Sequence, residues 1–461
     1  MSPHVVVGTS VAAMAAVDQL ARAGEQVRWL VTGPAGGAFA PKTVDGRHVG
    51  LGLRLIEREY VAGENAEPMP PMSQHVPGHA GHRPWMGLVA DYLDELVPDL
   101  IAAPTPRLVL GERVVDDFTL TGRLATITEL LDARTCAQIA DELTAILSTT
   151  SPAGVLDPPG PMGMSLQQAS IANHGELFHR IVVDPIASAL VPGGASAVEA
   201  TQRHKIWAPI YWPETLWQAV SGQTPTFDPQ RQFWTDPNGG MSDVVTALEK
   251  RIGSASQVVR LNVGRLQSIA NMGTLTALRF DSGHEEHASA PILATPPTDT
   301  FSAAGIPHHA DRVAMSFLWL DVEERDVRNP APTTFLDDEV VFRVCSTTPA
   351  PDLTGTPRRA FSVELRTAAP PDARHVIRSM TRAGVIADGA RPAVVAHHRI
   401  PAFVVPSASN RHAFEQAIGD LADALPSTRL IGPLSGYGAD PLNEQLFGGI
   451  RLAEEVCGAH V

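Results

Sequence analysis

The sequence has few cysteines, no long apolar run and no basic leader, and each shortage excludes a class of protein. Its cysteines are Cys136, Cys345 and Cys457, which lie far apart and match neither a disulfide framework nor a zinc knuckle. No stretch approaches the roughly 20 apolar residues that a membrane-spanning helix needs, and the first residues do not resemble a signal peptide. We therefore expect a chain without disulfides or a membrane span, located in the cytoplasm.

Positive charge is scarce as well. The 461 residues include 50 acidic and 35 basic side chains, which give a formal net charge of -15, and the lysines are limited to Lys42, Lys205 and Lys250. Because nucleic acids and anionic membranes are bound by clustered lysine and arginine, neither is an expected partner. Hydrophobic residues make up 44% and charged residues 18%, as in an ordinary globular protein, and the length predicts two or three structural lobes.

The hydrophobic pattern predicts an α/β protein. A buried strand at 4–8, an alanine-rich helix at 11–23 and a second strand at 27–31 make the first half of a Rossmann unit. Helical patterns follow from 84 to 150, and the chain from 311 to 405 is rich in strands. We predict a discontinuous Rossmann-type nucleotide-binding domain at 1–63, 235–300 and 406–461, a largely helical insertion or substrate lobe at 64–234, and a strand-rich substrate domain at 301–405.

The turn after the first strand has the glycine spacing of a dinucleotide site, with two departures. Such a turn needs a glycine for the tight bend, a second glycine beside the pyrophosphate and a small third residue for helix packing. Gly8 and Ala13 meet the first and third needs, whereas Ser10 takes the second position, where its hydroxyl can donate to a phosphate. Val31 replaces the acidic residue that binds the ribose, with Thr32 as a substitute. Alone, the turn fits a nucleotide site and a plain strand-helix junction equally well.

Further short motifs follow the turn in a fixed order. They are Gly36-Gly37 with Asp45-Gly46 and Leu51-Gly52; Gly239-Gly240-Met241 with a strand at 258–263; the passage 290–297; and 429–432 with 436–440 and Gly448-Gly449. In this order the chain resembles the flavin amine oxidase superfamily, which includes protoporphyrinogen oxidase, phytoene desaturase, monoamine oxidase and UDP-galactopyranose mutase. The resemblance spans nearly the whole chain, and the helical insertion is most similar to the mutase branch.

The resemblance implies FAD as the cofactor. The contacts it implies are at Gly8, Ser10, Ala13, Thr32, Gly36, Gly37, Val259, Gly432, Gly438 and Leu442. Several cofactor positions depart from the pattern: besides Ser10 and Val31, Ala38 stands where an arginine is usual and Gly50 where an acidic residue is frequent. Either FAD is bound by an altered set of contacts, or the fold persists while the flavin has been weakened or lost.

Aromatic residues gather between 201 and 234 and form a candidate substrate wall. The predicted substrate-binding residues are Arg203, Trp207, Tyr211 and Trp212. The resemblance implies a lysine beside flavin N5, for which Lys205 is the candidate, and Tyr437 in the C-terminal motif is the second catalytic candidate. The alternative is that the aromatic passage is a packing patch between lobes and that Tyr437 is a turn residue packed under the last helix.

The sequence lacks the motifs of serine hydrolases, P-loop enzymes and zinc enzymes, so these classes are not predicted. The sequence has neither a Gly-x-Ser-x-Gly elbow nor a phosphate loop. His75, His79 and His82, and likewise His284 and His287, match no zinc spacing, so no metal is predicted. We expect an FAD-dependent oxidoreductase acting on a C–N or C–C bond of a small molecule, in specialised biosynthesis. The alternatives are a flavin-assisted sugar-nucleotide mutase and a flavin-free binding protein; a homo-oligomer is left open.

Overall fold

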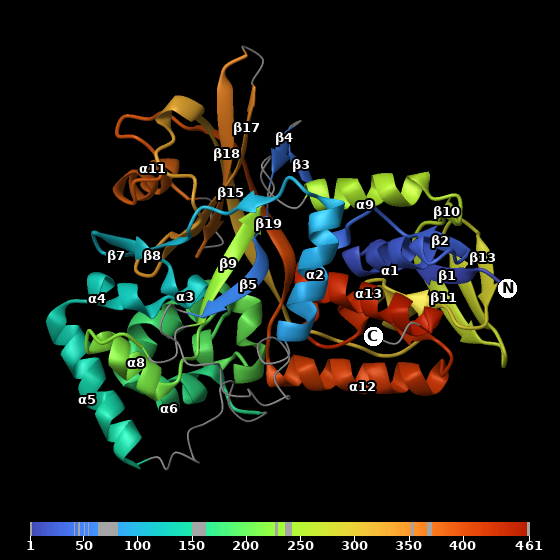
Figure 1. The fold of residues 1–461 in the computed structure, drawn as a ribbon, viewed down its shortest axis with the longest axis horizontal. Coiled ribbons are helices and arrows are strands. Elements are labelled where there is room, and N and C mark those ends of the chain that lie inside the picture. Colours follow the sequence, from blue (N-terminus) through green and yellow to red (C-terminus); the bar gives the residue numbers. More distant parts are fainter. Residues whose placement is uncertain are drawn as a thin grey trace.

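A computed structural model describes residues 2–40, 42–44, 47–49, 51–53, 55–62, 82–149, 163–225, 229–235, 242–351, 355–366 and 371–458. The predicted motifs at Asp45-Gly46, Gly50 and Gly239-Gly240-Met241, and the histidines His75 and His79, lie outside these residues. Figure 1 shows the parallel sheet at the right, with a second, strand-rich part and a helical part at the left. No helix in the described ranges has the length and apolar character to cross a membrane.

The first part is built on a parallel sheet of five strands. In sheet order these are β10 (Val258–Asn262), β2 (Val27–Val31), β1 (His4–Val7), β14 (Ile292–Leu293) and β20 (Arg429–Leu430). Every pairing between them is parallel. Strand β1 enters helix α1 (Val11–Arg22) through Gly8, and α1 ends before Gly24, which has a φ of 84°. The predicted Rossmann unit is confirmed, because strands buried on both faces read as continuous apolar runs.

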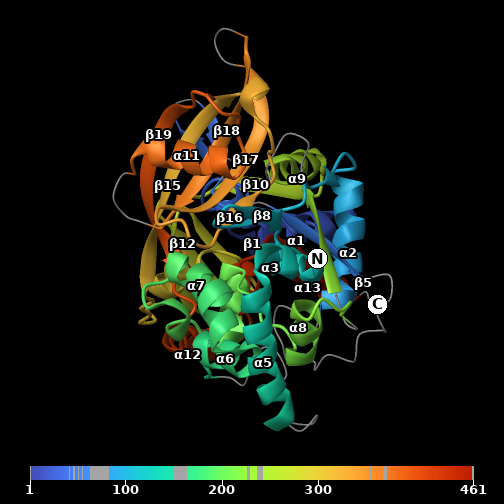
Figure 2. The same ribbon diagram turned by 90° about the vertical axis from the view of Figure 1, so that its left-hand side faces the viewer.

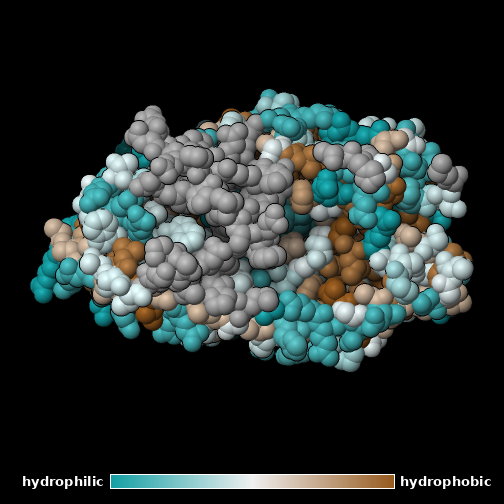
Figure 3. Space-filling model, turned by 60° about the horizontal axis from the view of Figure 1, so that its bottom comes forward, coloured by the Kyte–Doolittle hydropathy of each residue, from teal (hydrophilic) through white to brown (hydrophobic). Residues whose placement is uncertain are grey.

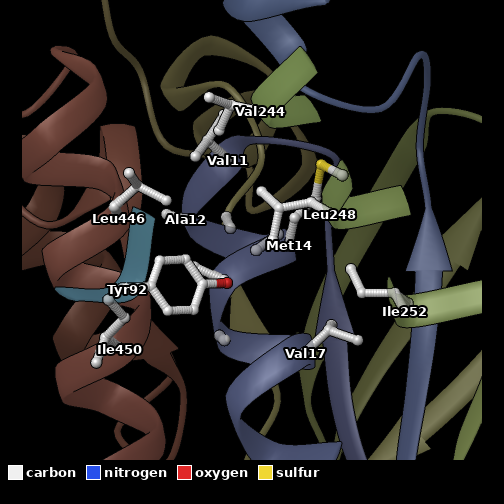
Figure 4. Close-up of a cluster of buried hydrophobic side chains, with 14 of the residues drawn as sticks. Val11, Ala12, Met14, Val17, Tyr92, Val244, Leu248, Ile252, Leu446 and Ile450 are labelled. Atoms are coloured by element: carbon white, nitrogen blue, oxygen red, sulfur yellow. The ribbon is translucent and has the colours of Figure 1, made fainter. Parts of the chain in front are cut away.

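Helices cover one face of this sheet. They are α1, α2 (His82–Leu96), α9 (Ser242–Ser254) and α13 (Leu442–Cys457). Figure 4 shows Val11, Met14 and Val17 of α1 beside Val244, Leu248 and Ile252 of α9, with Leu446 and Ile450 of α13 and Tyr92 of α2 on the other side of α1. Helix α2 therefore packs into this core although its residues fall in the range predicted for the insertion. The periodicity of a helix shows which face is apolar but not which partner covers that face.

The opposite face of the sheet packs against a small antiparallel sheet and two helices. The elements are β11 (Leu266–Asn271), β12 (Thr276–Phe280), β13 (Glu285–Ala288), α10 (Pro297–Ala303) and α12 (Ala408–Ala424). Leu30 and Leu293 of the parallel sheet lie in one core with Phe280 and Phe414. Strands β12 and β13 pair antiparallel as a hairpin around residues 281–284.

The strand-rich part is a mixed sheet of seven strands. In sheet order these are β19 (Ala393–Val404), β15 (Arg312–Glu323), β18 (Pro357–Leu365), β17 (Val341–Pro351), β16 (Thr333–Phe335), β7 (Arg107–Leu110) and β8 (Arg113–Asp116). Helix α11 (Ala373–Arg382) covers one face through Val376 and Met380. Strands β7 and β8 come from the range predicted as helical insertion. That range, which also contains α2, is therefore shared among three parts of the fold.

The helical part has a core of its own. Its helices are α3 (Phe118–Thr121), α4 (Ile127–Leu130), α5 (Ala133–Thr149), α6 (Leu166–Phe178), α7 (Asp184–Leu190) and α8 (Pro213–Val220). One small sheet pairs β3 (Lys42–Val44) with β4 (Arg47–Val49). In another, β9 (Pro229–Thr235) lies between β5 (Ile56–Ala62) and β6 (Ile101–Ala102). Figure 2 shows the helical part below the strand-rich sheet, and Figure 1 places both on the same side of the parallel sheet. The exact domain boundaries stay predictions.

Candidate cofactor and active site

The turn between β1 and α1 has the geometry that glycine and a helix N-terminus provide. Gly8 has a φ of 123°, and a Cβ built on it would lie 2.7 Å from the carbonyl carbon and oxygen of Ala294. Ser10 caps α1, with its Oγ accepting the backbone N–H of Ala13 at 3.2 Å. The first turn of α1 contains no acidic residue. An anion is favoured at such a helix end, and the Ser10 hydroxyl keeps a proton with which to donate.

The predicted second glycine pair lies beside this turn. Ser10 and Gly36 form an isolated parallel β-bridge. Gly36 and Gly37 have φ values of 88° and 56°, and a Cβ on Gly36 would lie 2.7 Å from a methyl carbon of Val245 on α9. Only glycine fits that space, so the pair is needed to bring this segment against the turn.

Ligands of parallel sheets bind at the carboxyl ends of the strands. Of the predicted contacts, Thr32 lies at such an end and Val259 does not. Val31 ends β2 in the α1-side core, and Thr32 follows it. Val259, in contrast, is the second residue of β10, is paired with Arg28 and is 53% exposed. Val259 as a cofactor contact stays a prediction. Asn262, which pairs with Val31 at the carboxyl end of β10, was missed from sequence and offers a carboxamide at this edge.

The C-terminal motif returns to the N-terminus of α1. Gly432 has a φ of 61°, and a Cβ on it would lie 2.8 Å from Ala12 Cβ and 3.3 Å from Ser10 Oγ. Leu442 is buried at the start of α13, and Gly449 of the same helix lies against α1, because its Cβ would be 2.4 Å from the carbonyl oxygen of Ala12. The structure thus gathers Gly8, Ser10, Ala13, Gly36, Gly37, Gly432 and Leu442 around one strand-helix turn.

The two predicted catalytic residues lie next to each other. Lys205 belongs to a short 3-10 helix, Ala200–Ile206, and its Nζ is 2.7 Å from an Asp440 carboxylate oxygen. The same Nζ lies 4.6 Å from the centroid of the Tyr437 ring. The Lys205 side chain is 9% exposed, whereas that of Asp440 is 56% exposed. The tyrosine hydroxyl donates to the carbonyl oxygen of Val405 at 2.6 Å. Their catalytic role stays a prediction.

Gly438 lies against the 3-10 helix that contains Lys205. A Cβ on Gly438 would lie 2.6 Å from Gln202 Oε1 and 3.1 Å from His204 Nε2. Burial, together with the neighbouring charges of Arg203 and Lys205, lowers the pKa of His204 to about 4. His204 is therefore neutral near pH 7, and the positive charge at this position belongs to Lys205 and Arg203.

The predicted substrate-binding residues separate into two groups. Arg203 is 4% exposed in the 3-10 helix beside Lys205. Trp207 ends that helix with a φ of 58°, and its ring centroid is 6.0 Å from that of Phe233. Tyr211, however, donates its hydroxyl to the carbonyl oxygen of Phe118, and Trp212 is the N-cap of α8. Both positions lie within the helical part; substrate contact and packing between lobes stay predictions for all four residues.

A row of cross-strand neighbours on the seven-stranded sheet contains a buried ion pair that was not predicted from the sequence. Phe317, Glu364, Arg343 and Thr334 are direct cross-strand neighbours on β15, β18, β17 and β16. Arg343 and Glu364 are 5% exposed, with 3.8 Å between guanidinium and carboxylate. A Cβ on Gly52 would lie 2.7 Å from Glu364 Oε1, so this row faces the N-terminal part of the chain. Strand alternation puts these residues on one face, but only the register aligns them.

Glu444, in the first turn of α13, has a pKa near neutrality. Burial, together with the neighbouring charges of Glu57 and Asp440, raises the pKa of its carboxyl to about 7. The unfolded chain releases this proton near 4.5, so the folded protein binds more protons between pH 4.5 and 7. Glu444 thus makes the free energy of unfolding decrease as the pH rises through that window.

Glu444→Gln is expected to raise the free energy of unfolding at pH 8 by about 1–3 kcal/mol. The gain should vanish at pH 4, where the native carboxyl is already protonated. Urea unfolding at both pH values measures the difference. Glu455→Gln, on the same helix but 74% exposed, is the control and should change little at either pH. A gain of equal size at both pH values would show that ionisation is not its cause.

Figure 3 shows a hollow surrounded by hydrophobic residues on the face that it brings forward, in the right-hand half of the molecule. That half contains the parallel sheet in Figure 1. An apolar recess of this kind is the usual setting of small-molecule and cofactor sites, where a few polar groups fix the orientation of the ligand.

No protein-family profile and no curated protein sequence matches the chain. Solved structures match over its full length. Reduced UDP-galactopyranose mutase has a TM-score of 0.69 at 13% identity, covering 100% of this chain and 95% of the mutase. A putative protoporphyrinogen oxidase from Exiguobacterium sp. 255-15 has a TM-score of 0.61 at 12% identity, with 100% of both chains covered. Putrescine oxidase bound to putrescine has a TM-score of 0.57 at 14% identity, with 99% of both covered.

The chain has the amine-oxidase-like fold. Identities of 12–14% establish the architecture and leave the activity open. The fold class and the resemblance predicted from sequence are confirmed. Within the amine-oxidase-like fold, the site described above comprises the β1–α1 turn, the glycine pair and the C-terminal motif.

Proposed function

We propose that the chain is an FAD-dependent oxidoreductase that acts on a small molecule. The observation that carries the proposal is the convergence of Gly8, Gly36 and Gly432 on the capped N-terminus of α1. Each allows a close backbone approach that a Cβ would block. A helix end without acidic residues and approached by glycine backbone suits a diphosphate.

The residues present fit FAD better at one end than at the other. Ser10 and the first amides of α1 would hold the pyrophosphate. Close by lies a buried side-chain oxygen of Gln445 that finds no donor among the residues the structure describes. At the adenosine end, Val31 offers no hydrogen bond to the ribose, and Thr32 and Asn262 are the nearby polar side chains. When bound, FAD would accept a hydride from the substrate.

The chain's own residues would orient the substrate and control charge. The ion pair with Asp440 and the face of Tyr437 fix the position of the Lys205 ammonium group. Arg203 adds a second buried positive charge in the same 3-10 helix, which suits a substrate with an acidic group. Tyr437 and Trp207 supply aromatic surface that excludes water.

The absorption spectrum of the purified protein, before and after addition of FAD, tests the cofactor directly. Oxidised flavin bands that remain after gel filtration support the proposal. A colourless protein that does not bind added FAD would support the flavin-free binding protein instead.

Val31→Glu is expected to tighten FAD binding by about tenfold, because a carboxylate at this strand end accepts the ribose hydroxyls. Titration with FAD, followed by flavin fluorescence, gives the Kd. FMN, which lacks the adenosine ribose, is the control ligand and should bind both proteins equally. An unchanged Kd for FAD would show that the ribose does not lie at Val31.

A sugar-nucleotide mutase is the second candidate, and the TM-score of 0.69 with UDP-galactopyranose mutase favours it. The two candidates differ in electron balance. An oxidoreductase consumes one equivalent of electron acceptor for each product formed, whereas a mutase rearranges its substrate with no net consumption. Measuring acceptor consumption against product therefore separates them.

A further inference from the structure

Gln445, on the first turns of α13, has a side-chain amide whose orientation is fixed. The residue is 2% exposed. Its Nε2 donates to the backbone oxygen of Asp440 at 2.8 Å, and its backbone N–H donates to Pro441. Since the amide nitrogen must face the Asp440 carbonyl, the side-chain oxygen must point the other way.

That oxygen has no hydrogen-bond donor in the described part of the chain. Buried acceptors are nearly always paired, and leaving one without a donor is unfavourable. The Gln445 oxygen lies 3.9 Å from the position of a Cβ on Gly432, which is itself 3.3 Å from Ser10 Oγ. The unpaired acceptor is therefore at the N-terminus of α1, where the diphosphate is proposed to bind.

The sheet order shows which part of a dinucleotide would pass this oxygen. The ribose of the adenosine is expected at the end of β2, on one side of β1. Gln445 follows β20, which lies on the opposite side of β1, beyond β14. A ligand that crosses the turn from the β2 side thus reaches Gln445 with the part beyond its diphosphate. Phosphate oxygens only accept, so the donor must be a hydroxyl or N–H group.

We propose that Gln445 is a binding residue for the ribityl chain of the flavin, accepting a hydrogen bond from one of its hydroxyl groups. This inference rests on the proposed function, because it needs a flavin at the α1 turn. It also gives the Gln445 side chain two separate roles: its nitrogen holds the Asp440 segment, and its oxygen contacts the ligand.

Gln445→Leu tests the inference through Kd values for FAD, FMN and ADP and through thermal unfolding without ligand. FAD and FMN, which carry the ribityl chain, are expected to bind about tenfold more weakly, whereas the Kd of ADP should not change. The unfolding midpoint of the ligand-free protein should change little, since the lost Nε2 hydrogen bond to the Asp440 carbonyl is offset by removal of the buried side-chain oxygen. Gln267→Leu, at an exposed position of β11, is the control and should leave every Kd unchanged.

The results separate the inference from the proposed function. Weaker FAD and FMN binding with unchanged ADP binding would support it. If FAD binds both proteins equally, or if Gln445→Leu only lowers the unfolding midpoint, Gln445 is a packing residue and flavin binding stands. If the unaltered protein binds neither FAD nor FMN, the proposed function fails and the inference fails with it.

Discussion

Gly8→Ala is expected to give the largest loss of stability in the part built on the parallel sheet. An alanine at a φ of 123° is strained, at a cost of about 1–3 kcal/mol. Its Cβ would also lie 2.7 Å from the backbone of Ala294, which cannot rotate away as a flexible side chain could. Moving β14 away from β1 adds about 1–3 kcal/mol. Chemical unfolding followed by circular dichroism measures the sum, and FAD binding should be lost as well.

Two glycines elsewhere provide controls for this result. Gly24→Ala has a similar positive φ of 84° but open space around its Cβ, so it isolates the backbone strain. Gly419→Ala, inside α12 with nothing near its Cβ, is expected to stabilise the protein by about 0.5–1 kcal/mol. Equal losses for Gly8→Ala and Gly24→Ala would contradict the steric argument. If Gly8→Ala does not accumulate, Ala294→Gly in the same chain provides no relief, because the clash is with backbone atoms.

Asp18→Asn is expected to lower the free energy of unfolding by about 3 kcal/mol, since breaking a buried ion pair leaves one charge without its partner. Asp18 is 2% exposed and accepts from Arg251 through two nitrogens and from the Tyr92 hydroxyl at 2.8 Å. The interaction joins α1 to α9 and α2. The pKa of Tyr92 is raised because the residue is buried and lies beside the Asp18 carboxylate. The tyrosine therefore remains a donor to Asp18.

The exposed pair Arg451 and Glu454 supplies the comparison for Asp18. Both side chains are accessible, at 52% and 21%, so Glu454→Gln should change stability by less than about 0.5 kcal/mol. Tyr92→Phe should cost about 1.5 kcal/mol, because it removes one hydrogen bond to a charged group and leaves the ion pair. Urea unfolding at pH 7 measures all three variants. An Asp18→Asn loss as small as that of Glu454→Gln would show that the three helices are held by apolar packing alone.

The secondary structure of the part built on the parallel sheet followed from local patterns. Apolar runs identified β1 and β2, and the alanine-rich stretch between two breakers identified α1. These signals survive because the strands are buried on both faces and the helix is closely packed. The same method assigned α2 to the insertion, because an amphipathic helix shows its apolar face without naming its partner.

Some residues of the candidate site were predicted from local sequence patterns and others were not. Glycine spacing predicted Gly8, Gly36 and Gly432, since each is required by a local backbone conformation that the sequence records directly. Val259 was chosen because its strand resembles a cofactor-contacting segment, and this contact stays a prediction. Asn262, Glu444 and Gln445 were missed because nothing in a local pattern distinguishes a polar residue that lines a site from one in water.

By itself, the sequence determined the Rossmann unit, the strand-rich and helical parts, and the glycines on which the turn depends, because periodicity and backbone requirements act over a few residues. Only the tertiary structure placed Lys205 beside Tyr437 and Asp440, aligned Arg343 with Glu364, and left one oxygen of Gln445 without a donor among the described residues. These contacts join segments that are distant in the chain. They depend on how the three parts pack, and the packing is set by the summed burial of many residues rather than by any local motif.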